Sequence, residues 1–557
     1  MKGIRSFRGV RSNWGVLALA FLILMAPCLA EAKNVIVLMT DGTGSTHTTI
    51  ARWYKGGPLA LDEMFLSGYR TYGADSIITD SAPAATAHAT GFKTSDKFIG
   101  VLPKEVTIPG LTPIAEDLKY KPVATVLEGA KIKGKSVGLV ATSNIQHASP
   151  AAYSAHWPDR GNYNEIAQQQ VYLDIDVAFG GGKQYLLPTS MGGKRTDGEN
   201  LLDVLTSRGY EVVENRTDML NFNGQKVWGL FAQDAMAYEF DRRELYPDQP
   251  SLAEMTAKAI EILSQNNEGF FLFVEASKVD WASHANDPIG VISDVLAFDE
   301  AVRVALEFAK KNGETLVLAY SDHGNGGMSL GSKKTDNTYS KLGVGPLVDP
   351  LKRAKLTGEG VEAVLRSDFS NENAIRLAME QYYGISDLTL EEMDAIKGAK
   401  KGSLNYVIGP MISNRSTIGW TTNGHTGEDL FFYYYGYPKP MRIMENTDIA
   451  HLCAKFLGFD LYKMNKRLFV KAEEAFEPLG ATVAVDKTSD PANPALVIEK
   501  GKRKARLPLS TDLFMCGDRW VHPMEGLTIL AGPGTSYERV FVPHQAVNFF
   551  RMCSQGR

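Results

Sequence analysis

Four short apolar runs in the sequence show no regular alternation of apolar and polar residues, and each ends at polar or charged side chains. A strand with one face in water alternates, whereas a strand buried on both faces does not. Unalternating strands are typical of parallel sheets that helices cover on both sides. The four runs are NVIVLMT at 34–40, VGLVATS at 137–143, FFLFVEA at 270–276 and TLVLAYS at 315–321.

Helical patterns separate these apolar runs. The stretches 252–265 and 291–311 repeat apolar residues at intervals of three and four, as an amphipathic helix does. Alternation of strands and helices predicts an α/β fold, with a doubly wound, mainly parallel central sheet flanked by helices. Ligands of such sheets bind at the carboxyl ends of the strands. Asp41, Glu275 and Asp322 stand at those ends, so we expect them to belong to a functional site.

The first 32 residues have the layout of a signal peptide. Basic residues precede an apolar run at 14–25, and the small residues Ala30 and Ala32 follow it, as they do before a cleavage site. We therefore predict that 1–32 is removed and that the mature protein is periplasmic or secreted. The apolar run is short for a membrane span. A retained anchor is the alternative, but we expect no stable membrane insertion.

Two parts of the remaining chain differ from the main catalytic region, which we place at 33–470. Residues 330–418 carry their own helical patterns, including a capping-box start at Thr389, and we interpret them as an insertion near the site. From 471 to 557 the segments ATVAVD, ALVIEKGKRKARLPL and RVFVPHQAVNFF are separated by Gly and Pro. Their alternating character predicts a β-rich C-terminal extension.

Charge and cysteine content restrict the partners of the chain. The formal net charge of -5 shows no basic excess, so the bulk electrostatics indicate neither nucleic acid nor an anionic membrane surface. Three cysteines remain once 1–32 is removed. An oxidising compartment would permit a disulfide between Cys516 and Cys553, whereas Cys453, inside an apolar helical pattern, is expected to be a buried thiol.

The segment TDSAPAATAHATGF places Ser81 at the start of a predicted helix, with Pro83 in its first turn and Gly91 near its end. One interpretation makes Ser81 a helix N-cap. The other is catalytic, because free backbone N–H groups and the positive end of the helix dipole favour an ionised serine and a bound phosphate. Serine is a weak nucleophile without a base or a metal ion. Since the segment has no GxSxG elbow, activation by a metal ion is favoured.

Six His and Asp residues follow apolar runs or stand in polar loops, and together they suit two zinc ions. They are Asp41, Asp280, His284, Asp322, His323 and His425. Asp280 and His284 are four residues apart, so a helical turn would place both on one face. His425 taken alone is typical of a surface histidine. Two zinc ions could clamp the attacking and leaving oxygens of a phosphoryl transfer.

In order and spacing these residues resemble the alkaline phosphatase family, from about residue 34 to about residue 465. The resemblance implies hydrolysis of phosphate monoesters through a phosphoserine at Ser81, with two zinc ions and one magnesium ion as cofactors. It implies that the zinc ion that ionises Ser81 is bound by Asp41, Asp322 and His323, and that the other zinc ion is bound by Asp280, His284 and His425.

The resemblance also implies roles around the phosphate and the magnesium ion. Arg160 resembles the arginine that grips phosphate, and its planar fork suits two phosphate oxygens. Asp80 is expected to orient Arg160. Glu275 and Ser149 resemble magnesium ligands, and Asp41 resembles the carboxylate shared between zinc and magnesium.

Two positions beside the expected magnesium site vary within the family. His147 stands where the best-known bacterial form has Asp, and Trp281 stands where that form has Lys. A neutral imidazole attracts magnesium less strongly than a carboxylate does. We therefore expect looser magnesium binding and some dependence on added divalent metal. Lys278, three residues after Glu275, is interpreted as a solvated charge or a charge at the pocket edge.

Three rival functions stay open: a phosphodiesterase or a sulfatase of the same superfamily, and a non-catalytic periplasmic binder of metal or phosphate. Ala85 stands where the sulfatase conversion signal needs Arg. Phosphodiesterase relatives usually carry Thr in place of Ser81 and lack the arginine matched by Arg160, and a binder has no need of Ser81. Small phosphate monoesters are the expected substrates, no nucleic-acid partner is expected, and a homodimer stays open.

Overall fold

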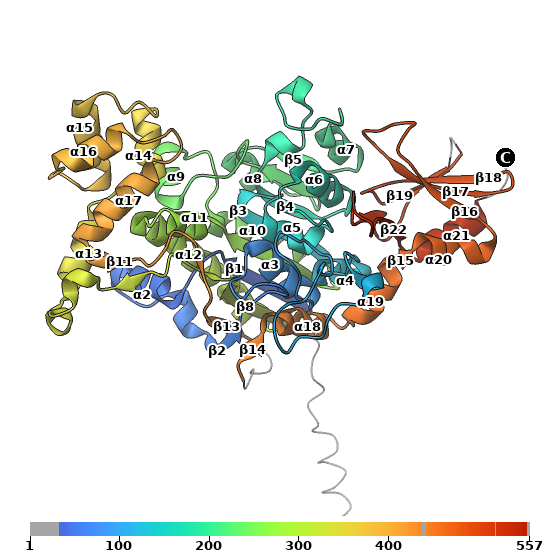
Figure 1. Cartoon of the computed structure of the whole chain (residues 1–557), viewed down its shortest axis with the longest axis horizontal. Helices are drawn as coiled ribbons and strands as arrows, with labels where there is room; N and C mark the ends of the chain where they lie inside the picture. The colour runs from blue at the N-terminus through green and yellow to red at the C-terminus, as the bar shows by residue number, and fades with distance from the viewer. Residues whose placement is uncertain (1–32, 437–441, 518–519, 554–557) are drawn as a thin grey trace, which may run out of the picture.

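A mixed sheet of ten strands forms the centre of the protein (Figure 1). The structure, a computed structural model, describes residues 33–436, 442–517 and 520–553, so the predicted signal peptide lies outside the described residues. The four middle strands are all parallel, in the order β8 (Thr315–Ser321), β1 (Asn34–Thr40), β7 (Phe270–Ala276) and β3 (Ser136–Asn144). They coincide with the four apolar runs, and the predicted α/β class is confirmed.

Strands on both sides extend this parallel centre. Beyond β3 the sheet continues in parallel with β4 (Val177–Gly181), β6 (Val227–Leu230) and β5 (Glu211–Val213). Beyond β8 it continues with β13 (Leu430–Tyr435), β2 (Phe65–Arg70) and β14 (Met444–Glu445). Because β13 runs antiparallel to both of its neighbours, the sheet is mainly but not wholly parallel.

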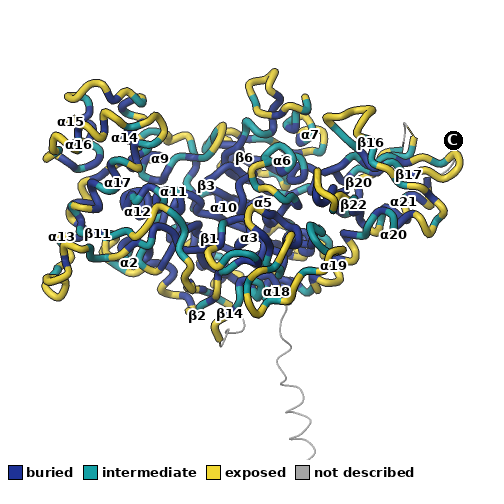
Figure 2. The backbone as a smooth tube through the Cα atoms, viewed as in Figure 1, coloured by how far each residue is buried: buried dark blue, intermediate teal, exposed yellow. Residues whose placement is uncertain are grey.

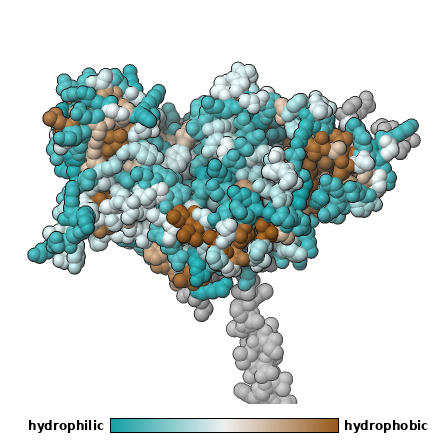
Figure 3. Space-filling view, in the orientation of Figure 1, coloured by the Kyte–Doolittle hydropathy of each residue, from teal (hydrophilic) through white to brown (hydrophobic). Residues whose placement is uncertain are grey.

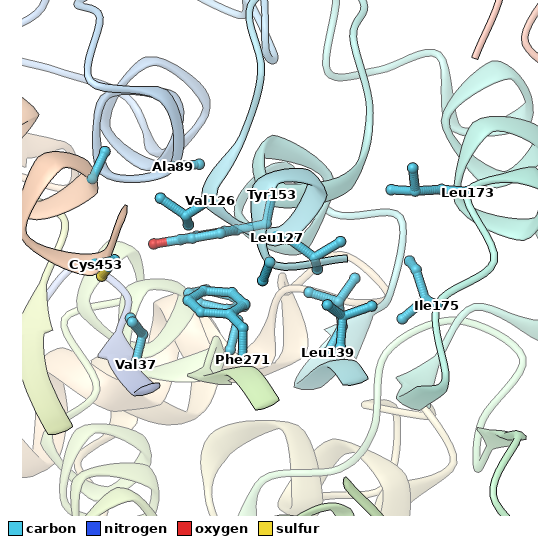
Figure 4. Packing of buried hydrophobic residues seen from close by; sticks show 14 of the residues in the cluster. Val37, Ala89, Val126, Leu127, Leu139, Tyr153, Leu173, Ile175, Phe271 and Cys453 are labelled. Atoms are coloured by element: carbon cyan, nitrogen blue, oxygen red, sulfur yellow. The ribbon is translucent and has the colours of Figure 1, made fainter. Parts of the chain in front are cut away.

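Alternate residues of the middle strands enter two different cores. Val35 and Val37 of β1 belong to a core with helices on one face of the sheet, which Figure 4 shows around Val37. Ile36 and Leu38 belong to a second core on the other face. The first face is covered by α3 (Ser81–Thr90), α4 (Val126–Ile132), α5 (Ala148–Ser154) and α18 (Asn446–Phe456), and the second by α10 (Leu252–Leu263) and α12 (Pro288–Asn312). The buried strands run through the middle of the molecule in Figure 2, so the sheet is doubly wound.

A group of helices packs at one end of the molecule (Figure 1). They are α13 (Val344–Lys352), α14 (Gly358–Leu365), α15 (Glu372–Tyr383), α16 (Leu390–Lys397) and α17 (Leu404–Arg415). The capping box at Thr389 begins α16, as predicted. The chain enters and leaves this group through β10 (Ser329–Leu330) and β11 (Ile418–Gly419), which pair antiparallel. The division of the chain into domains stays a prediction.

The C-terminal part lies at the opposite end (Figure 1) and presents an apolar area on the face that Figure 3 shows. Five antiparallel strands form its sheet: β16 (Thr482–Asp486), β17 (Ala495–Lys500), β18 (Arg503–Pro508), β19 (Leu513–Cys516) and β20 (Trp520–Pro523). The β-rich character is confirmed, except that RVFVPHQAVNFF is half strand, β22 (Arg539–Val542), and half helix, α21 (Gln545–Met552).

The cysteines behave as the sequence indicates. Cys516 at the end of β19 forms a disulfide with Cys553, which follows α21, and Cys453 on α18 is a buried free thiol. Within the described residues, no helix has both the length and the apolar character that crossing a membrane requires.

The turn after β1 packs against α11 (Lys278–His284) with no spare room. Gly42 adopts a left-handed backbone conformation with φ of 66°, which glycine adopts without steric cost. A Cβ atom at Gly42 would lie 2.6 Å from Oδ1 and 2.7 Å from Cα of Asp280. Because one of these contacts is to backbone, a side chain at Gly42 would displace α11.

We predict that Gly42→Ala destabilises the protein more than the left-handed conformation alone explains. Gly313 is the matched control, because it has φ of 75° and a Cβ there would meet nothing within 4 Å. Gly313→Ala should cost about 1 kcal/mol of unfolding free energy from backbone strain. Gly42→Ala should cost about 1–3 kcal/mol more from overpacking. Equal losses for the two variants in denaturant unfolding would show that the contact with α11 is not tight.

Candidate metal centre and active site

The carboxyl ends of the middle strands bring acidic side chains together. Asp41 follows β1 directly, Asp322 follows β8, and Glu275 is the last residue but one of β7. The register places Met39 of β1 opposite Glu275 on one side and opposite Tyr320 on the other. The three carboxylates therefore share one edge of the sheet, and all three are fully buried.

His323 completes a first group of metal-binding side chains with Asp41 and Asp322. Its Nε2 lies 3.3 Å from Oδ1 of Asp41 and 3.4 Å from Oδ2 of Asp322. One donor atom from each of the three residues lies within 4.8 Å of the others. Nitrogen and oxygen donors at this spacing suit a zinc ion.

A second group adjoins the first. Asp280 and His284 lie on α11, with Oδ2 of Asp280 at 3.4 Å from Nε2 of His284. His425 on β12 (His425–Thr426) places its Nε2 at 3.2 Å from that of His284 and at 3.6 Å from Oδ1 of Asp280. Asp280 and His425 also form a compact group with His323, whose ring stacks on that of His425 at 3.8 Å. The two groups are therefore contiguous.

Ser81 faces the first group from the start of α3. Its Oγ lies 3.4 Å from both carboxylate oxygens of Asp41 and 3.2 Å from Nε2 of His323. Only 2% of Ser81 is exposed. Asp80, not Ser81, occupies the N-cap position of α3, so the interpretation of Ser81 as the helix cap is wrong. Ser81 is the first residue of the helix, where backbone N–H groups have no partner within the helix.

A third group lies behind Asp41. Donor atoms of Asp41, His147 and Glu275 lie within 4.8 Å of one another. Oε1 of Glu275, Oγ of Ser149 and Nδ1 of His147 are buried without a hydrogen-bond partner among the described residues. Buried polar atoms normally have partners. The oxygens of Glu275 and Ser149 therefore fit a hard cation such as magnesium.

Electrostatics favour cations at this edge of the sheet. Burial raises the pKa of Asp41 well above its usual range, and the neighbouring charge of Asp322 raises it further. Burial likewise raises the pKa of Glu275 to about 7. A carboxylate that is buried beside other carboxylates resists ionisation unless positive charge compensates it. A bound divalent cation would supply that charge.

Arg160 reaches the same region from the loop after α5. One guanidinium nitrogen donates to both carboxylate oxygens of Asp80, at 2.8 and 2.7 Å, and the other lies 3.0 Å from Nε2 of His147. Since a guanidinium only donates, Nε2 of His147 accepts and the imidazole proton is on Nδ1. Burial lowers the pKa of His147 to about 3, so this ring is neutral. Trp281, on α11, contacts the ring edge to face at 5.8 Å.

Two residues beside the site make buried contacts that sequence reasoning did not find. His47 on α2 (Ser45–Lys55) accepts a hydrogen bond from the backbone N–H of Gly44 through Nδ1, at 3.1 Å, and its Nε2 lies 3.0 Å from Oγ of Ser283 on α11. Burial lowers the pKa of His47 to about 4, so the neutral ring ties the loop after Asp41 to the helix of Asp280. No sequence signal marks His47.

Lys278 is the second, and its interpretation as a solvated or pocket-edge charge is wrong. It is 3% exposed, because α11 turns its first residue inward against Tyr238 and Met236. Its Nζ lies 4.0 Å from the centre of the Tyr238 ring and donates to the carbonyl oxygen of Met236 at 3.1 Å and to Oε2 of Glu359 at 2.8 Å.

Comparison with known proteins gives one consistent result. Residues 32–459 match the sequence profile of the family described as alkaline phosphatase. Alkaline phosphatase 3 of Bacillus subtilis is 36% identical over 461 residues, which cover 78% of this chain and 91% of that protein. The solved structure of Thermus thermophilus alkaline phosphatase is 27% identical, with a TM-score of 0.68, over 77% of this chain and 92% of that one.

A second solved structure carries a bound metal ion. It is a variant of the alkaline phosphatase from the Antarctic bacterium TAB5 in which Asp replaces a His, with magnesium bound in its M3 site. It is 26% identical to this chain, with a TM-score of 0.54, over 78% of this chain and 99% of that one. The sheet, the clustered metal-binding side chains and these matches lead to one conclusion: the chain belongs to the alkaline phosphatase family, metal-dependent phosphoric monoester hydrolases.

Proposed function

We propose that this chain hydrolyses phosphate monoesters by double displacement, with Ser81 as the nucleophile. The observation that carries the proposal is the position of the Ser81 hydroxyl, between Asp41 and His323 and beside two contiguous groups of metal-binding side chains. A protein that only bound metal or phosphate would have no need of a buried serine there. Ala85 in place of the Arg of the sulfatase signal, and the presence of Arg160, support a monoesterase over a sulfatase or a phosphodiesterase.

We further propose that the three groups hold two zinc ions and one magnesium ion. Histidine nitrogens and carboxylate oxygens suit zinc, and these are the donors of the first two groups, Asp41 with Asp322 and His323, and Asp280 with His284 and His425. Oxygen donors suit magnesium, which Glu275, Ser149 and Asp41 would bind. Bound there, the ions would neutralise charge on the transferring phosphate and favour the ionised serine.

The residues of the chain contribute binding, orientation and the covalent step. Arg160 is placed to donate to two phosphate oxygens through its planar guanidinium, and Asp80 holds the guanidinium in place. The Ser81 hydroxyl loses its proton and its oxygen forms a bond to phosphorus, while the bond from phosphorus to the alcohol oxygen breaks and that oxygen takes up a proton. Water then loses a proton and its oxygen bonds to phosphorus, while the bond from phosphorus to Ser81 breaks and the Ser81 oxygen regains a proton, so phosphate is released. The backbone N–H groups at the start of α3 favour the negative charge of both steps.

The setting of the enzyme is part of the proposal. We propose that 1–32 is a cleaved signal peptide and that the protein acts in the periplasm or outside the cell. The disulfide between Cys516 and Cys553 supports this setting, because structural disulfides persist in oxidising compartments. We also retain the division into a catalytic region at 33–470, with an insertion at 330–418, and an extension at 471–557.

Ser81→Ala should abolish turnover without emptying the metal groups. The expected loss in kcat for an aryl phosphate is about a thousandfold or more, since the covalent route is removed. Radiolabelled phosphate should be trapped on the wild-type protein at acidic pH and not on the variant, while metal analysis of both should agree. Ser45→Ala, a change at an exposed serine nearby, is the matched control. Label on the Ser81→Ala variant, or a wild-type preference for a bis-aryl phosphate or an aryl sulfate, would contradict the proposal.

His147→Asp should tighten magnesium binding. The variant replaces a neutral ring by a carboxylate beside Glu275 and Asp41, and the TAB5 variant with the same type of replacement holds magnesium. We expect the magnesium concentration that half-restores activity after dialysis against a mild chelator to fall about tenfold. His451→Asp, at an exposed histidine on α18, controls for added negative charge. The expectation fails if wild-type activity survives the dialysis unchanged.

A further inference from the structure

The proposed mechanism does not use Lys278, although its charge is buried beside the site. A buried ammonium group is costly unless it is paired and fully hydrogen-bonded. The carboxylate of Glu359 and the carbonyl of Met236 meet it directly, and two aromatic rings lie against it. Glu359 belongs to α14, so the charge of Lys278 is balanced from the helical group that the chain inserts between β10 and β11.

The start of α14 is fixed firmly next to α11. The backbone N–H and the hydroxyl of Thr357 both donate to Asp241, at 2.8 and 2.6 Å, and the N–H of Gly358 donates to Asp287 at 3.1 Å. Both aspartates are buried. A Cβ at Gly358 would lie 2.5 Å from Cα of Asn405 on α17, so this helix cannot shift freely. The seating of α14 therefore sets the position of the Glu359 carboxylate.

On the side away from Glu359, a series of side-chain contacts connects Lys278 to the proposed phosphate-binding region. Its ammonium lies 5.1 Å from the centre of the Trp281 ring, within the range of a cation–π interaction. Trp281 meets His147 at 5.8 Å, and His147 accepts from Arg160 at 3.0 Å. Each step is an ion pair, a hydrogen bond, a cation–π interaction or an edge-to-face ring interaction. The chain of contacts runs from the inserted helices to the guanidinium of Arg160.

We propose that Lys278 is a positioning residue, which couples the seating of α14 to the orientation of Arg160 through Trp281 and His147. The inference rests on the proposed role of Arg160 in binding phosphate. Asp80 holds one guanidinium nitrogen, and His147 holds the other. When Lys278 no longer fixes the Trp281 ring, the His147 ring loses its support. Arg160 then keeps only its hydrogen bonds to Asp80, and its guanidinium samples orientations in which it donates to only one phosphate oxygen.

The test is Lys278→Met, which keeps an unbranched side chain only one heavy atom shorter and removes its charge. We expect KM for an aryl phosphate and the inhibition constant of inorganic phosphate to rise together by about three- to tenfold, the range of coupling between contacting residues. We expect kcat and metal content to stay within about twofold, because Ser81 and the metal groups are untouched. Lys397→Met is the matched control. Lys397 pairs with Glu372 on the exposed surface of the helical group that also contains Glu359.

A double-mutant cycle separates positioning from general damage. In an Arg160→Ala background, Lys278→Met should no longer weaken phosphate binding, because the residue through which it acts is absent. Equal weakening in both backgrounds, or a loss of kcat and metal content with KM unchanged, would overturn the inference. If Lys278→Met does not fold, Glu359→Gln tests the same link and should shift KM in the same direction. A wild-type protein without phosphatase activity would overturn the proposed function itself, whereas an active enzyme insensitive to Lys278→Met would overturn only this inference.

Discussion

The carboxylates of Asp41, Asp322 and Glu275 are held at one edge of a parallel sheet, and water does not reach them. The register of β1 with β7 and β8 fixes their spacing, so they cannot relieve their mutual repulsion by moving apart. They can therefore ionise together only when positive charge lies beside them. This fixed spacing of buried carboxylates accounts for the neighbouring histidines, for the position of Arg160 close by and for the fit to divalent cations. Function in this family begins with a fold that concentrates negative charge where it is costly.

Packing around the site holds these carboxylates close to the other predicted metal-binding side chains. The loop after Asp41 is pressed against α11 at Gly42 and is tied to the same helix by His47. These contacts bring Asp280, from one helix, to the carboxylates that follow the strands. The candidate metal-binding side chains therefore belong to elements that protein contacts hold together. A preorganised site of this kind loses little free energy in ordering its ligands when the ions bind.

The sequence predicted the strands and most of the site because the signals are local. An unalternating run such as 34–40 reports burial on both faces, and Asp41 follows it directly. His425 could be placed only by the family resemblance, since nothing local distinguishes it from a surface histidine. The burial of Lys278 could not be predicted at all, because its partner Glu359 is 81 residues away. The prediction for RVFVPHQAVNFF was half wrong for another reason. Its second half is the helix α21, which packs against β19.

Lys278 and Arg160 show how two buried cations near one site can differ in function. Arg160 donates to the Asp80 carboxylate through one guanidinium nitrogen and to the neutral His147 ring through the other, and a fifth of its side chain is exposed, so it can still meet an anionic substrate. Lys278 is sealed between Glu359, a carbonyl and two rings, so its charge has no route to the substrate. It can influence catalysis only through the contacts that it holds in place. The aromatic pair of Trp281 and His147 lies between the two cations.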